Sequence, residues 1–173
     1  MKRGKKIKSS DTFFILIRYL IALGIIFALP VIYRIAKPLT IIPSVYLLDL
    51  FYSIQRFHDY IIIDTSTFID IIPACIAGSA YLLLLIINLL TPMKLKKRIY
   101  TLLFSLLLLL ALNILRIVIV SVWYHEKIIF FEFTHAVLWY VLSTVFVVVI
   151  WIFTIRVYTI KEIPVYTDIK RFL

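Results

Sequence analysis

The sequence predicts an all-α membrane protein, a single integral domain over residues 1–173. We expect a polytopic bundle of about four transmembrane helices, a short re-entrant or interfacial helix and a small extracellular extended segment. Three observations predict this class. Hydrophobic residues make up 64% of the chain, the mean hydropathy is +1.07, and long apolar runs alternate with short basic clusters. This composition excludes an ordinary soluble domain.

The charge of the chain is explained by membrane topology. The net charge of +10 could suggest nucleic-acid binding. The basic residues, however, lie in short clusters between apolar runs, as the positive-inside rule describes. We therefore expect no nucleic-acid partner. The single cysteine excludes an internal disulfide and leaves its thiol free for reaction.

The first predicted span covers residues 12–33 and follows a basic cluster at residues 2–8. The apolar run is too long for a signal peptide, and no small-residue cleavage site follows it. We interpret it as a retained anchor whose N-terminus is cytoplasmic.

The next apolar stretch, residues 38–55, is interrupted by Pro43 and Asp49. Its marginal length favours a re-entrant or interfacial helix. If it does not cross, the N-terminal cluster, the basic loop at 94–98 and the basic tail at 156–171 all lie on one side. The positive-inside rule then predicts that this side is the cytoplasm and that both termini lie there.

Residues 56–70 are rich in β-branched side chains and are broken by a polar turn, which predicts a short hairpin or extended segment. This segment carries Asp59, Asp64 and Asp70. No predicted cytoplasmic segment is as acidic, so we expect it outside the membrane.

Three further spans follow, at residues 72–90, 99–124 and 134–158. Cys75 lies in the first turn of one span, Arg116 lies about two turns below the outer end of the next, and His135 opens the last. Because these helices alternate in direction, the three residues are expected in the same leaflet, near the outer face.

Each of these residues also has a simpler structural interpretation. A lone cysteine commonly packs as a small hydrophobe, Arg116 could snorkel to the interface, and Asn113 could hydrogen-bond a neighbouring helix. His135 at a helix end could be an ordinary interfacial residue. The convergence of Cys75, Arg116 and His135 in one leaflet favours a functional site.

The chemistry that such a set permits is acyl transfer. Cys75 would be the nucleophile, which Arg116 would hold as a thiolate, and Arg116 could also bind the oxyanion. His135 would be the general acid and base. Zinc binding is the competing use of cysteine and histidine, but an arginine beside the ligands would repel the ion. We therefore expect neither a metal nor another cofactor.

The sequence resembles the archaeosortase/exosortase family of membrane enzymes over residues 64–155. The motifs that carry the resemblance are Pro73-Ala74-Cys75 followed by Gly78-Ser79, then Asn113-x-x-Arg116-Ile117, and His135 at the start of the next helix. The chain departs from many members in having Ile76 and Ala77 before the glycine, and in its small number of spans. It looks like a small archaeal-type member.

The resemblance implies a cysteine transpeptidase or protease of the cell membrane. Its substrates would be exported proteins that end in a short motif, a transmembrane helix and a basic tail. Cys75 would form a thioacyl-enzyme, and the new C-terminus would pass to an acceptor such as a lipid head group. Asn113, Gly78 and Ser79 are expected to support the catalytic residues Cys75, Arg116 and His135.

A different class of function also fits the sequence. The protein could be a non-catalytic membrane scaffold or assembly factor, in which Cys75 is a packing residue. Arg116 and Asn113 would then hold helices together.

Overall fold

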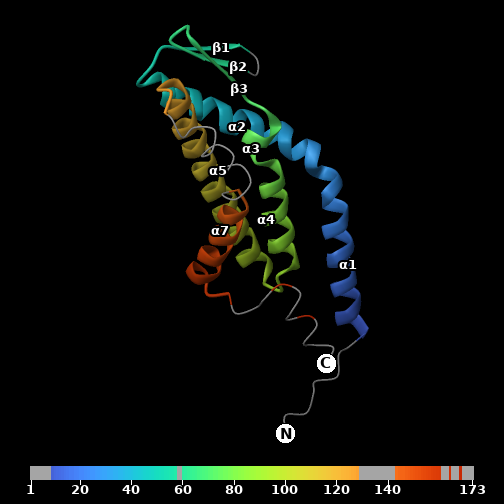
Figure 1. Cartoon of the computed structure of the whole chain (residues 1–173). Coiled ribbons are helices and arrows are strands. Elements are labelled where there is room, and N and C mark those ends of the chain that lie inside the picture. The colour runs from blue at the N-terminus through green and yellow to red at the C-terminus, as the bar shows by residue number, and fades with distance from the viewer. Residues whose placement is uncertain (1–8, 58–59, 129–142, 161–163, 165–167, 169–173) are drawn as a thin grey trace.

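The computed structural model describes residues 9–57, 60–128, 143–160, 164 and 168, and most of these residues are helical. A small antiparallel sheet lies at one end of the helices (Figure 1). The helices are α1 (Ser9–Ile25), the 3-10 turn η1 (Ile26–Ala28), α2 (Leu29–Asp49), α3 (Pro73–Ile76), α4 (Gly78–Leu90), α5 (Leu95–His125) and α7 (Ser143–Val157). The strands are β1 (Ile54–Phe57), β2 (Tyr60–Ile63) and β3 (Thr67–Asp70).

The first two helices are joined by a bend. Pro30 lies in the first turn of α2 and has no N–H to donate to the Ile26 carbonyl, so the α-helical ladder is interrupted there. Leu29 instead donates to Ile26 in a 3-10 turn. The predicted span at 12–33 therefore bends before its end.

Helix α2 contains most of the predicted interfacial helix. It runs through Pro38 and Pro43 and ends at Asp49, short of the predicted end at residue 55. It contacts α3, α4, α5 and β1. In Figure 1 it turns away from α1 and crosses between the sheet and the ends of α4 and α5.

The predicted span at 72–90 is divided. Ala77 has a left-handed conformation (φ 57°, ψ 33°) and separates the one-turn helix α3 from α4. The 13 residues of α4 extend only about 20 Å, less than a hydrocarbon core of about 30 Å. The predicted continuous span is therefore not a single helix.

Helix α5 contains the whole predicted span at 99–124. Its 31 residues extend about 46 Å. Within the residues that the structure describes, two helical stretches are long and apolar enough to cross a membrane, Ile15–Asp49 and Leu95–His125. The first part of the span predicted at 134–158 lies outside the described residues, and α7 accounts for the rest.

The extended segment predicted at 56–70 is confirmed as part of a three-stranded sheet. The strand order is β1-β2-β3, and both pairs are antiparallel. Ile61 and Ile63 of β2 are buried against the helices.

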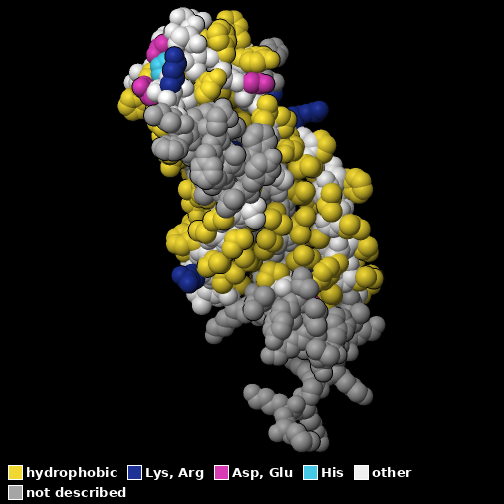
Figure 2. All heavy atoms as spheres, viewed as in Figure 1, with side chains coloured by type: hydrophobic (Ala, Val, Ile, Leu, Met, Phe, Trp, Pro, Cys, Tyr) yellow, Lys and Arg dark blue, Asp and Glu magenta, His cyan; other side chains and the backbone are white. Residues whose placement is uncertain are grey.

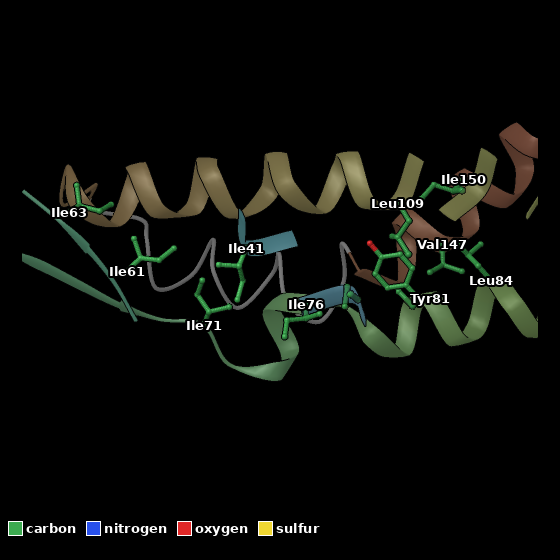
Figure 3. Packing of buried hydrophobic residues seen from close by; sticks show 13 residues of the cluster. Ile41, Ile61, Ile63, Ile71, Ile76, Tyr81, Leu84, Leu109, Val147 and Ile150 are labelled. Atoms are coloured by element: carbon green, nitrogen blue, oxygen red, sulfur yellow. The ribbon is translucent and has the colours of Figure 1, made fainter. Parts of the chain in front are cut away.

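Most of the buried hydrophobic residues form one continuous cluster from the sheet to α7 (Figure 3). Ile41 of α2, Ile76 of α3 and Ile71, which precedes α3, lie between the sheet and the contacts of α4 with α5. Large hydrophobic side chains also cover much of the helical surface (Figure 2). The shared core fixes the positions of α3 and the sheet against α5.

Candidate active site

Cys75 is held in a single helical turn. Pro73 begins α3, where its fixed φ suits the first helical position and its missing N–H costs no hydrogen bond. The left-handed Ala77 then ends the turn. Cys75 therefore lies next to the break between α3 and α4, and it is only partly buried.

Gly78 allows this break to pack closely against α2. A Cβ atom at Gly78 would lie 2.6 Å from the Tyr33 ring, closer than carbon atoms can approach. Gly78 thus supports the site through packing. Ser79 is exposed and does not line the cavity beside Cys75.

Cys75 and Arg116 line the same cavity, which has a volume of about 220 Å³. One wall comes from the end of β3 and the residue after it, and the other comes from α5. The lining residues are Phe68, Ile69, Asp70, Ile71, Cys75, Arg116, Ile117, Val120, Ser121 and Tyr124. The structure therefore brings together two of the three predicted catalytic residues.

The charge of Arg116 acts directly on this cavity. Arg116 is 8% exposed. Burial disfavours the ionised form of the Cys75 thiol, and the nearby Arg116 guanidinium opposes that effect electrostatically. Burial strengthens the attraction between a guanidinium and a thiolate, because little water lies between the two charges to screen them. Asp70 also interacts with the thiol, with the opposite sign.

Asn113 connects α5 to α3. Its side-chain amide donates a hydrogen bond of 2.9 Å to the Cys75 backbone carbonyl, and the residue is 2% exposed. Asn113 and Arg116 are three residues apart and share a helical face. One face of α5 therefore holds the Cys75 backbone and places a charge near its thiol.

His135, the predicted general acid and base, lies outside the described residues. Another histidine, His125, ends α5 directly after the cavity residue Tyr124. Its Nδ1 lies 2.9 Å from the Thr67 hydroxyl oxygen, and its Nε2 lies 3.5 Å from an Asp64 carboxylate oxygen. His125 thus connects β3 and the preceding turn to α5.

Tyr52 reinforces this connection from the turn that follows α2. Its ring packs edge-on against His125 at 5.0 Å between centroids, and its hydroxyl donates a 3.0 Å hydrogen bond to Glu126. This bond stabilises the protonated phenol and so raises the pKa of Tyr52.

Sequence reasoning did not select Asp70, Ser121 and Tyr124, which also line the cavity. The two residues of α5 could have been identified by helical spacing, because they follow Asn113 and Ile117 on one face. The four residues on that face are Asn113, Ile117, Ser121 and Tyr124. No comparable signal identifies Asp70, because its place depends on how the sheet packs on the helices.

Across the described ranges, no group of three or more His, Cys, Asp or Glu residues could hold a metal ion. Comparison with protein-family models, curated proteins and solved structures finds no match to this chain.

Proposed function

We propose that the protein is a membrane-embedded cysteine transpeptidase or protease that cleaves C-terminal sorting signals of exported proteins. The observation that carries this proposal is the shared cavity of Cys75 and Arg116. A buried arginine beside the only cysteine is costly in a membrane protein and is therefore expected to have a function. The resemblance to the archaeosortase/exosortase family supports the same function.

In the proposed reaction, the Cys75 thiolate attacks the carbonyl carbon of the scissile peptide bond. Arg116 stabilises the thiolate first and then the oxyanion of the tetrahedral intermediate. The carbon–nitrogen bond breaks, and the leaving amine takes a proton from His135. An acceptor such as a lipid head group, or water, then loses a proton to His135 and attacks the thioester, which releases Cys75.

The cavity fits the first step of this chemistry. The bond from Asn113 holds the Cys75 backbone, so the nucleophile is positioned before the substrate binds. We place the site near the outer face of the cell membrane, with both termini in the cytoplasm.

Substitution of Cys75 tests the proposal. Cys75→Ala and Cys75→Ser should each abolish processing of a reporter that ends in a short motif, an apolar span and a basic tail. Serine is nearly isosteric with cysteine but is far less ionised, so chemistry should be lost while folding is preserved. Reporters should be built from proteins of the same genome that share such an ending. Normal processing by both variants, at matched membrane abundance, would exclude Cys75 as the nucleophile.

A second candidate is a non-catalytic membrane scaffold or assembly factor. The hydrogen bond from Asn113 to the Cys75 carbonyl favours it, because that bond also serves simply to hold α3 against α5. A scaffold would not require an ionised thiol. The reactivity of Cys75 toward an uncharged alkylating reagent therefore distinguishes the two functions.

A further inference from the structure

The edge of β3 leads into the cavity that holds Cys75 and Arg116. β3 is the last strand in the order β1-β2-β3, and within the described residues its second edge is not paired with another strand. Such an edge presents backbone N–H and C=O groups that can pair with another extended chain.

The cavity lies along this edge and is not confined to one face of the sheet. Ile69 is paired with the buried Ile61 and so belongs to the inner face. Phe68 and Asp70 are its neighbours on the opposite face, because successive side chains of a strand alternate. Phe68, Ile69, Asp70 and Ile71 nevertheless all line the same cavity. Residues from both faces can share one cavity when it runs beside the strand.

We propose that the outer edge of β3 binds an extended peptide segment as an additional strand. This inference rests on the proposed function and names its substrate class: a polypeptide that pairs through its backbone with residues 67–70 and continues toward Cys75. Backbone pairing of this kind supplies affinity, while alternate side chains supply specificity.

The charges around the cavity favour the same occupant. Arg116 offers hydrogen-bond donors at the Cys75 end, where a peptide carbonyl would lie during attack. Asp70 is exposed and has no ion-pair partner among the described side chains. A segment with a basic side chain beside Asp70 should therefore bind better than one with an acidic side chain.

The first test measures how fast peptide disulfides react with Cys75 of the full chain in detergent. The probe is a short peptide of alternating threonine and valine that ends in a cysteine amide activated as its thiopyridyl disulfide. Cys75 attacks the peptide sulfur, a mixed disulfide forms, and thiopyridine leaves and is measured by its absorbance. The control probe is the activated cysteine amide alone, which reports the reactivity of the thiol without any strand.

We expect the peptide to react at least about tenfold faster than the control probe. N-methylation of successive peptide nitrogens should reduce this advantage at every second position, because alternate N–H groups of a paired strand point toward its partner. If Cys75 reacts measurably with the control probe, an equal rate for the peptide, or N-methylation effects without this alternation, would overturn the proposal.

A second measurement does not depend on the thiol. The same peptide carrying a benzophenone in place of the disulfide should cross-link to residues 67–71 in the Cys75→Ala variant. Cross-links found only outside the cavity lining, or none above those of a scrambled proline-rich peptide, would overturn strand addition. An inert Cys75 together with cross-links at 67–71 would contradict the proposed catalytic function but would support peptide binding at the edge of β3.

Discussion

At the residue scale, the site depends on close packing as well as on charged and nucleophilic groups. Arg116 could be selected from the sequence because a charge within an apolar run is rare and costly. The role of Gly78 could not, because the Tyr33 ring that excludes a side chain there belongs to a helix distant in sequence. The same holds for the left-handed Ala77, since a non-glycine residue seldom adopts that conformation.

We expect Gly78→Ala to destabilise the protein by about 1–3 kcal/mol, as is typical when a methyl group is forced into a packed site. The Tyr33 ring would have to move, because it lies 2.6 Å from the new Cβ atom. Thermal unfolding in detergent should show the loss, and Tyr33→Leu in the same chain should restore part of it. Gly24→Ala is the matched control, since apart from its chain neighbours and the backbone of its own helix no atom lies within 4 Å of its Cβ position. Equal stability of the two alanine variants would contradict this account.

At the element scale, the sheet forms a wall of the cavity only because it is fixed to α5. The sequence predicted the extended segment from β-branched residues between polar turns. It did not predict the contact of His125 with Thr67, because residues 58 positions apart in the chain form it. Helix boundaries near residues 28 and 77 were also missed, since a 3-10 turn and a left-handed alanine leave little trace in hydrophobic periodicity.

We expect His125→Phe to loosen the sheet. Phenylalanine retains a ring against Tyr52 but loses the hydrogen bond to Thr67 and the contact with Asp64. The loss of about 1 kcal/mol should speed hydrogen exchange of amides in β2 and β3 roughly fivefold. Thr67→Val should have a similar effect, and the two changes together should add little more, since each removes the same bond. Unchanged exchange in both variants would show that His125 does not hold the sheet.

At the scale of the whole molecule, the arrangement of the elements separates two ends. Figure 1 places the sheet at one end, and the start of α1 and the turn between α4 and α5 at the other. The paired Arg18 and Asp168 connect the C-terminal part of the chain to α1. Composition was sufficient to predict a largely helical, apolar chain. It could not predict that α2 bends across the ends of α4 and α5, because that path depends on tertiary contacts.

We expect the sheet to face the outside of the cell and the start of α5 to face the cytoplasm, because basic residues favour the cytoplasmic side. Single cysteines can be placed at Ser66 and Lys96, which are both exposed, in a Cys75→Ala chain. A membrane-impermeant maleimide should label Ser66→Cys in intact cells and Lys96→Cys only after permeabilisation. The reverse pattern would invert the topology and place the cavity on the cytoplasmic side.

The rate at which an uncharged reagent such as iodoacetamide alkylates Cys75 at neutral pH tests most directly whether Arg116 activates the thiol. Arg116→Gln should lower this rate at least about tenfold, because the thiolate loses a charge that water screens poorly. Arg98→Gln is the matched control: it removes a second arginine of α5, one that instead donates to the Thr91 carbonyl, and it should react like the unaltered protein. If Arg116→Gln reacted as fast as Arg98→Gln, Arg116 would not activate Cys75, and the proposed catalytic pair would be contradicted.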